Sequence, residues 1–329
     1  MYSVITGWGM AVPEKVLTNA DFEKMVDTTD EWIVSRTGIK ERHMAGPDET
    51  PSTLGLQAGK MALEKAGITP QDLDLIIVAT VTGDYSFPST ANLIQNQIGA
   101  TCPAFDIQAA CTGWIYGVIT ASQFIKAGAM KHILIIGVET LSKITDFTDR
   151  ATCVLFGDGA GAVVLSAGKT KGGVLGWTFG SDGSDPERLY RPAGGSRCPI
   201  TPENVGKSET FIHMNGSEVF KFATRKMGVA VEEALQKAEL TPHDIDLFIP
   251  HQANLRIIEA ASRRLELPPE KVFVNVEKYG NTSAASIPIA LCEAIACGRV
   301  QYGNKIAVVA FGGGLTWGAL VVEWTAKNS

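Results

Sequence analysis

Apolar and polar positions follow one another along this chain in blocks that predict strands and helices in alternation. Short runs in which nearly every residue is apolar predict strands covered on both faces, as in α/β folds. We expect such strands at Leu75–Val81, Ala104–Ile107, His132–Gly137, Ala162–Leu165, Leu247–Pro250, Val272–Val276, Ile306–Phe311 and Ala319–Trp324. Apolar residues at helical spacing predict helices at Thr53–Ala66, Ser89–Ile98, Gly113–Ala127, Ser217–Ala238, Asn254–Leu265 and Ser283–Ala296.

The order of these elements occurs twice. The stretch Ile68–Ile77 is matched by Leu240–Ile249, which shares its Thr-Pro-x-Asp motif and the strand that follows. Phe124–Gly128 and Ala294–Gly298, each before a strand, match at the same offset of roughly 170 residues. Two matches at one offset predict an internal duplication of one α/β unit.

The duplication predicts two halves, residues 1–170 and residues 171–329. No Pro- or Ser-rich linker separates them, so we expect one packed body. The segment Gly180–Phe211, with its Gly, Pro and Ser, departs from the pattern and is expected to run over the surface. Gly157-x-Gly159-x-Gly161 resembles a dinucleotide-binding loop, but it precedes a strand rather than a helix, so we interpret it as a structural turn.

Composition restricts the class of protein. Hydrophobic residues make up 45% of the 329 residues and charged residues 19%, as in a globular protein with a large core. The net charge of −6 provides no basic field for nucleic acid. The chain opens on strand-like residues, and no apolar run has membrane-spanning length. The six cysteines lack zinc-site or disulfide spacing, so we expect a cytoplasmic protein with reduced thiols.

Cys111 falls where the strand Ala104–Ile107 gives way to the helix that begins at Gly113. A thiol at a helix N-terminus meets unpaired backbone N–H groups and the positive end of the helix dipole, which favour the thiolate. The small neighbours of Cys111 leave room for a substrate. These features indicate a nucleophilic cysteine, although a single Cys is more often a buried core thiol.

Two further residues are candidates for the same site. If a pseudo-two-fold axis relates the halves, the strand before Cys111 corresponds to Phe273–Val276, and the turn after it brings Asn281 to face Cys111. His251 follows the repeated strand, at the carboxyl end where open α/β sheets bind ligands. A lone His is more often structural, but this position favours a catalytic role.

Six motifs in chain order give the sequence a family resemblance. They are Asp30–Ile39, Ala109–Gly113, Phe156–Ala162, His251–Asn254, Gly280–Ser283 and Phe311–Gly318. Together they resemble β-ketoacyl-[acyl-carrier-protein] synthase III, the condensing enzyme that initiates bacterial type II fatty-acid synthesis, from end to end of the chain. The resemblance implies a thiolase-like α/β fold, in which two pseudo-two-fold related βαβαβαββ halves pack in α-β-α-β-α layers.

The resemblance implies a catalytic triad of Cys111, His251 and Asn281. Cys111 would take an acyl group, expected to be acetyl, from acyl-CoA. Malonyl-ACP would lose CO2 and attack the acyl-cysteine to give 3-ketoacyl-ACP. The N–H groups of Cys111 and Gly313 would form the oxyanion hole, and His251 and Asn281 would stabilise the enolate. Coenzyme A enters as a thioester substrate, and no cofactor or metal is expected.

The family also assigns a binding site for coenzyme A. The Trp32 indole would stack on the adenine and Arg36 would pair with phosphate, although two residues four apart on a helix also form plain cation–π pairs. The remaining contacts carried over from the family are Thr28, Arg150, Gly216, Phe220 and Asn254.

Pocket, dimer and carrier contacts follow from the same resemblance. Phe87 would cross the interface of a homodimer and wall the acyl pocket of the partner, unless it is an ordinary core aromatic, and Phe311 would line the acyl pocket. We hypothesise that Lys221 and Arg256 receive the acidic acyl carrier protein, while noting that charged runs are usually solvated faces.

Rival assignments differ in what they require. Elongating synthases carry a second His where Asn281 stands, and degradative thiolases carry a second Cys where this chain has Phe311–Gly314. A synthase-III-like acyltransferase of secondary metabolism would share the triad and stays open. A non-catalytic acyl-CoA-binding protein is disfavoured by the intact triad. The choice of primer depends on pocket shape, which the sequence does not fix.

Overall fold

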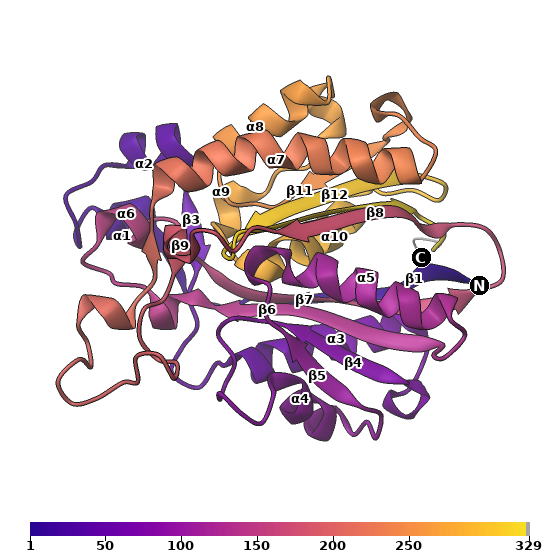
Figure 1. Cartoon of the computed structure of the whole chain (residues 1–329), viewed down its shortest axis with the longest axis horizontal. Helices are drawn as coiled ribbons and strands as arrows, with labels where there is room; N and C mark the ends of the chain where they lie inside the picture. Colours follow the sequence, from indigo (N-terminus) through magenta and orange to yellow (C-terminus); the bar gives the residue numbers. More distant parts are fainter. Residues whose placement is uncertain (327–329) are drawn as a thin grey trace.

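The computed structural model of the chain describes residues 1–326. Two β-sheets lie one above the other, with helices between them and on both outer faces (Figure 1). This is the predicted α-β-α-β-α layering, and the thiolase-like fold is confirmed.

The first sheet takes its strands from the first half of the chain. Its strand order is β1 (Tyr2–Ala11), β7 (Asp158–Gly168), β6 (His132–Thr140), β4 (Leu75–Ala79) and β5 (Ala104–Ile107). Strand β4 pairs in parallel with β5 and β6, whereas β7 runs antiparallel to β6 and β1. Gly159 and Gly161 lie inside β7, so the glycine motif forms part of a strand and its interpretation as a turn is wrong.

The second sheet repeats the pairing scheme of the first. Its strand order is β11 (Leu247–Pro250), β12 (Lys305–Gly312), β13 (Thr316–Glu323) and β8 (Gly173–Ser181). Strands β11 and β12 are parallel, and β12–β13 and β13–β8 are antiparallel, as β4–β6, β6–β7 and β7–β1 are. Four strands of each sheet therefore share one pairing scheme.

The Thr-Pro-x-Asp motif also forms the same local structure twice. In each half the Asp carboxylate accepts a hydrogen bond from the backbone N–H of the Thr, at 2.8 Å for Asp72 with Thr69 and 2.8 Å for Asp244 with Thr241. A short 3-10 turn follows, and the next strand is β4 in one half and β11 in the other. The motif caps the entry to equivalent strands.

The strand predicted at Val272–Val276 is wrong. Among the described residues Val272 makes an isolated parallel bridge with Phe248, and Val276–Tyr279 forms the short helix α9. The cause is Gln252, whose Oε1 accepts from the backbone N–H groups of Asn275 and Val276 at 2.9 and 3.1 Å. Because a side chain occupies these donors, they do not enter a ladder, and the second sheet lacks the counterpart of β5.

The six predicted helices are present, with ends shifted by a few residues. They are α3 (Pro51–Ala66), α4 (Thr90–Ile98), α5 (Gly113–Lys126), α7 (Gly216–Lys237), α8 (Leu255–Arg264) and α10 (Ser286–Ala296). Helices α3 and α4 pack on the outer face of the first sheet, and α7 packs on the outer face of the second, with α8 beside it. Helices α5 and α10 lie between the sheets, where apolar residues from both halves form one continuous core.

Short elements gather at the end of the molecule drawn on the left in Figure 1. They are β2 (Val16–Thr18), α1 (Asn19–Phe22), α2 (Asp30–Thr37), β3 (Glu41–His43), α6 (Arg150–Cys153), β9 (Leu189–Tyr190) and β10 (His213–Met214). Helix α2 begins at a Thr29 cap, whose side chain accepts from Trp32 N, and ends at Gly38 in the left-handed conformation. Among the described helices, none is both long and apolar enough to cross a membrane.

Candidate active site

Cys111 lies in the 3-10 turn η2 (Ala110–Thr112), which joins β5 to α5. The end of β12 packs against this turn so closely that a Cβ on Gly312 would lie 2.7 Å from the Cys111 nitrogen. Glycine is therefore required at residue 312 for the two halves to meet here. Cys111 is 8% exposed and lines a cavity. A ligand can therefore reach this buried residue through the cavity.

The resting sulfur of Cys111 is a thiol. Burial raises the pKa of Cys111 to about 12, the Ser283 side chain acts in the opposite direction, and the charge of the buried Glu139 adds to the rise. Burial thus acts against the expected stabilisation of the thiolate by the helix N-terminus.

His251 follows β11 and is fixed by its neighbours in the second half. Its backbone N–H donates to Val309 at 2.7 Å, and its Nδ1 lies 2.6 Å from the Ser286 hydroxyl. Burial lowers the pKa of His251 to about 3, so the imidazole is neutral. Ser286 Oγ also accepts from Gln252 N at 3.4 Å. In the tautomer in which the Ser286 hydroxyl donates to Nδ1, the ring proton lies on Nε2. Among the described residues Nε2 has no partner.

Asn281 lies between α9 and the 3-10 turn η8 (Ser283–Ala285), and the first half holds its backbone. Asn281 N donates to Leu155 at 2.8 Å, and Gly157 N donates to the Asn281 carbonyl at 3.0 Å. The Asn281 Oδ1 accepts from Ser283 N at 2.9 Å. The carboxamide therefore presents its Nδ2 as a donor, as the predicted role requires.

A cavity of about 550 Å³ adjoins Cys111. Its apolar walls come from several parts of the chain, namely Val81, Leu141, Ile144, Phe156, Leu189 and Ile212. Tyr190, Arg191 and Ala193 add to the wall. They belong to the segment Gly180–Phe211, which the sequence predicted only as a surface excursion.

The two predicted pocket aromatics lie outside this cavity wall. Phe311 is buried and packs edge-on against the His251 ring, with centroids 5.6 Å apart. Phe87 is 86% exposed, so the alternative of an ordinary core aromatic is wrong. Gly313, the predicted oxyanion donor, does line the cavity together with Cys111.

The residues predicted to bind coenzyme A lie around α2, α6 and the start of α8. The Arg150 guanidinium, rather than that of Arg36, lies over the Trp32 indole at 4.9 Å, and Arg150 also donates to the Asp27 carbonyl at 2.9 Å. Asn254 joins α8 to α2 because its Nδ2 donates to the Arg36 carbonyl at 3.0 Å. These side chains form one group in space.

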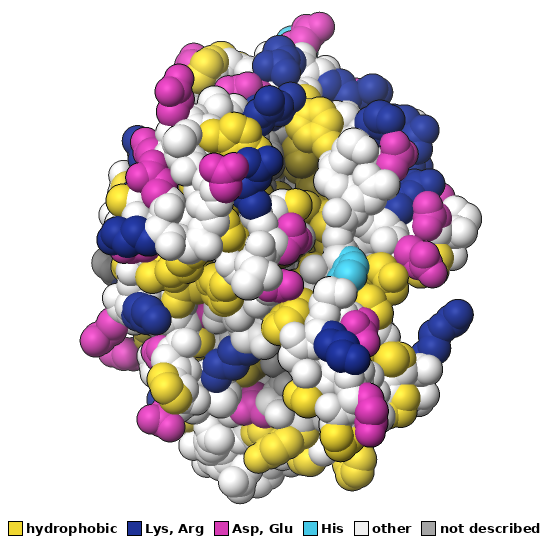
Figure 2. Space-filling view, turned by 90° about the vertical axis from the view of Figure 1, so that its left-hand side faces the viewer, with side chains coloured by type: hydrophobic (Ala, Val, Ile, Leu, Met, Phe, Trp, Pro, Cys, Tyr) yellow, Lys and Arg dark blue, Asp and Glu magenta, His cyan; other side chains and the backbone are white. Residues whose placement is uncertain are grey.

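The other binding residues extend this group along neighbouring elements. Gly216 is the first residue of α7, and Phe220, one turn later, has the Arg256 guanidinium over its ring at 5.1 Å. The Thr28 hydroxyl is buried and has no partner among the described residues. Lys221 is exposed and pairs with Glu218 at 2.8 Å. In Figure 2, Lys and Arg side chains gather over the upper part of this end of the molecule.

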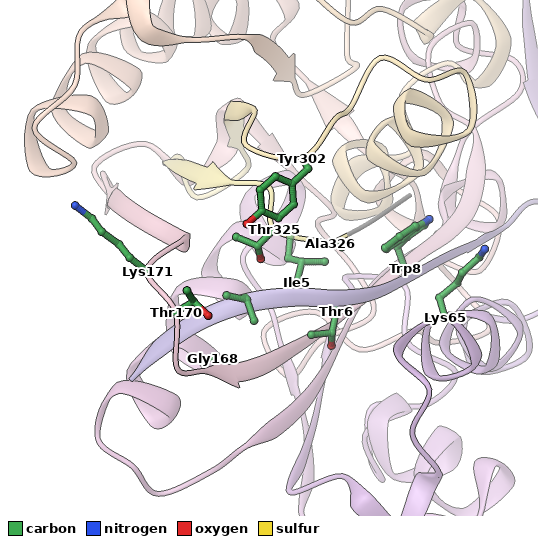
Figure 3. A pocket seen from close by; sticks show the side chains of 11 residues that line it. Ile5, Thr6, Trp8, Lys65, Gly168, Thr170, Lys171, Tyr302, Thr325 and Ala326 are labelled. Carbon is green, nitrogen blue, oxygen red and sulfur yellow. The ribbon is translucent and has the colours of Figure 1, made fainter. Parts of the chain in front are cut away.

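A second cavity, of about 390 Å³, lies elsewhere, beside β1 and the end of β7 (Figure 3). Trp8 and Lys65 stand on one side of it and Lys171 on the other, with Tyr302 between them. None of the residues predicted for catalysis or binding lines it. The cavity at Cys111 is therefore the candidate active site.

Polar residues to which the sequence analysis assigned no role also belong to this site. Ser286 orients His251, Ser283 orients Asn281, and Glu139 lies buried behind Ser283. Both serines fall in the Asn281–Ser286 stretch, where small polar residues open a helix, which is the one sequence signal that could have indicated them. Glu139 lies in an otherwise apolar strand, and its sequence context does not indicate which residues it contacts.

Fold and site together are typical of a thiolase-like condensing enzyme, in which a cysteine carries an acyl group and two neutral donors face it. Residues 105–183 match the family model described as 3-oxoacyl-[acyl-carrier-protein (ACP)] synthase III, and residues 235–324 match the model of its C-terminal part. The chain belongs to the β-ketoacyl-[acyl-carrier-protein] synthase III family.

Individual relatives cover the whole length of the chain. Identity is 55% with the β-ketoacyl-[acyl-carrier-protein] synthase III of Symbiobacterium thermophilum, over 97% of each chain. It is 54% with that of Caldanaerobacter subterraneus, over 98% of this chain and 97% of the relative. The crystal structure of the 3-oxoacyl-[acyl-carrier-protein] synthase III from Aquifex aeolicus superposes with a TM-score of 0.91 at 49% identity, covering 98% of this chain and 100% of that one.

Proposed function

We propose that this protein condenses an acyl-CoA primer with malonyl-ACP, with loss of CO2 and coenzyme A, to give the 3-ketoacyl-ACP that starts type II fatty-acid synthesis. The observation that carries the proposal is a buried cysteine that lines a largely apolar cavity, in a chain 55% identical to a synthase III. Thioester exchange and decarboxylation of this kind need no metal or redox cofactor.

In the first half-reaction the Cys111 sulfur attacks the thioester carbonyl of the primer. The tetrahedral oxyanion is held by the N–H groups of Cys111 and Gly313, and coenzyme A leaves with the proton that the thiol loses. Because burial raises the pKa of the resting thiol, the sulfur must lose its proton as it attacks the thioester. The apolar cavity receives the acyl chain.

In the second half-reaction malonyl-ACP loses CO2, and negative charge develops on its thioester oxygen. The Nε2–H of His251 and the Nδ2–H of Asn281 are neutral donors suited to that charge. The carbanion attacks the acyl carbonyl on Cys111, and the sulfur leaves and takes up a proton. Burial keeps His251 neutral, so it serves as a hydrogen-bond donor throughout.

Surface residues support the proposed binding of coenzyme A, of the carrier protein and of a second subunit. Trp32, Arg150 and Asn254 are proposed to bind the nucleotide end of coenzyme A, whereas Lys221 and Arg256 attract the acidic carrier protein. The exposed Phe87 supports a homodimer, because an aromatic side chain this accessible is stabilised by burial against a second subunit. We place the enzyme in the cytoplasm, where its thiols stay reduced.

The alternative function is acyl transfer in secondary metabolism. The structure of a priming β-ketosynthase from the R1128 polyketide pathway superposes with a TM-score of 0.90 at 34% identity, over 98% of this chain and 96% of that one. The lower identity favours primary metabolism.

The test is incubation with acetyl-CoA and malonyl-ACP, followed by mass spectrometry of protein and carrier. We expect an acyl adduct on Cys111 and acetoacetyl-ACP as product. Cys111→Ser removes the adduct, while Cys297→Ser, which changes an exposed cysteine, retains it. An adduct elsewhere, or turnover without any adduct, contradicts the mechanism; an adduct formed only with other primers favours the alternative.

A further inference from the structure

Glu139 is a fully buried carboxyl group that the two half-reactions do not use. It lies near the end of β6, and its side-chain partners in the described structure are neutral donors rather than a Lys or Arg. A carboxyl group buried without a cation is unfavourable unless donors satisfy it. Burial raises the pKa of Glu139 to about 7, against the lowering effect of these hydrogen bonds.

The donors to Glu139 come from two separate parts of the chain. On one side, Val81 N lies 3.2 Å from both carboxyl oxygens, and the Thr82 hydroxyl donates to Oε2. Val81 is also a wall residue of the acyl cavity. On the other side, the Ser283 hydroxyl donates to Oε1 at 3.3 Å across the junction of the two halves.

Ser283 connects Glu139 to the catalytic carboxamide. Its backbone N–H is the donor that fixes Asn281 Oδ1 at 2.9 Å, and its side chain also acts on the Cys111 thiol. Ser283 has a φ of +48°, a left-handed conformation that a non-glycine residue adopts only when its surroundings hold it. The hydrogen bond from Ser283 to Glu139 is one such restraint.

We propose that Glu139 is a positioning residue for the condensation step, which holds Ser283 so that Asn281 presents Nδ2 to the developing oxyanion. Glu139 also accepts from Val81 N, so it connects the turn that contains Ser283 to a wall residue of the acyl cavity. This inference rests on the proposed function of Asn281. The acylation step, which uses the backbone donors of Cys111 and Gly313, depends on Glu139 far less.

The test is Glu139→Gln, which keeps the shape but replaces one acceptor oxygen by an N–H that faces a donor. We expect kcat of condensation to fall by roughly ten- to a hundredfold, less than the loss of a whole oxyanion donor. Transfer of radiolabelled acyl groups to Cys111 and KM for malonyl-ACP should change by less than about threefold. Since the charge near the thiol is gone, alkylation of Cys111 by iodoacetamide should reach its half-maximal rate at lower pH.

Two further variants keep the test decisive. Asp158→Asn changes another fully buried carboxyl group that neutral donors satisfy, and it should not separate the two half-reactions. Ser283→Ala cuts the link itself and keeps the backbone N–H; Ala110 already adopts a φ of +46°, so alanine tolerates this conformation. It should lower condensation more than acyl loading even if Glu139→Gln folds poorly, although loading should also fall somewhat because the Ser283 side chain lowers the pKa of Cys111.

The outcomes separate the two proposals. Selective loss of condensation in Glu139→Gln and Ser283→Ala supports the positioning role. Equal loss of both half-reactions, the same pattern in Asp158→Asn, or normal condensation in Ser283→Ala overturns it. Wild-type protein that forms no adduct on Cys111 refutes the proposed function instead.

Discussion

Replacing Gly157 by alanine should impair the second half-reaction more than the first. A Cβ at residue 157 would lie 2.2 Å from the Tyr279 carbonyl oxygen, so the two segments would have to separate by roughly 1 Å to reach a tolerable contact. Those segments carry the hydrogen bonds between Gly157, Leu155 and Asn281. A displacement of about 1 Å at a catalytic group lowers a rate by about a hundredfold, whereas forced overpacking costs about 1–3 kcal/mol of stability.

The assay loads Cys111 with acetyl groups first and then follows acetoacetyl-ACP formation after malonyl-ACP is added. We expect that rate to drop by about a hundredfold. Acetyl loading of Cys111 should stay near normal, because the turn that holds Cys111 packs against Gly312 and not against Gly157. Gly183→Ala is the matched control, since no atom lies within 4 Å of its added Cβ. Wild-type condensation in Gly157→Ala, or equal losses in loading and condensation, would refute the idea that this backbone contact positions Asn281.

Three other changes test separate parts of the site. The pKa of His251 is about 3 in the folded protein and about 6.5 in the unfolded chain. Between these values only the unfolded chain binds the proton, so the free energy of unfolding should fall as pH drops from 6.5 toward 3. Urea unfolding measured across this pH range should show a weaker dependence for His251→Asn. Leu189→Trp should fill part of the cavity and slow loading with branched or long acyl-CoA more than with acetyl-CoA; an equal effect on all primers would contradict its place as the acyl pocket. Phe87→Asp should shift sedimentation from dimer toward monomer without lowering the melting temperature of the monomer, while Tyr302→Asp, another exposed aromatic, should leave the oligomer unchanged.

Much of the fold could be predicted because its strands and helices are strongly patterned. Strand β4 is buried along its whole length, so an unbroken apolar run was a reliable signal. Val272–Val276 is also largely apolar, apart from Asn275, but the backbone N–H groups of Asn275 and Val276 donate to the side chain of Gln252, which lies 23 residues before Asn275. No local pattern reports such a tertiary competitor.

Some parts of the candidate site could be predicted from the sequence and others could not. Cys111, His251 and Asn281 stand at turns whose place in the duplicated unit could be recognised from the sequence. The cavity wall at Leu189–Ala193 could not be predicted, because an irregular segment reveals its neighbours only after folding. The effect of burial on the pKa of Cys111 could not be predicted either, because the helix start is a local feature and burial is a property of the whole packed structure.

The buried, protonated state of Cys111 has a consequence for durability. Peroxide and similar oxidants attack thiolates that are open to water, and they convert them to sulfenic and higher acids. A sulfur kept as a thiol inside an apolar chamber offers such oxidants little to attack. We therefore expect the same burial that raises the pKa of the thiol to slow its oxidation in the free enzyme.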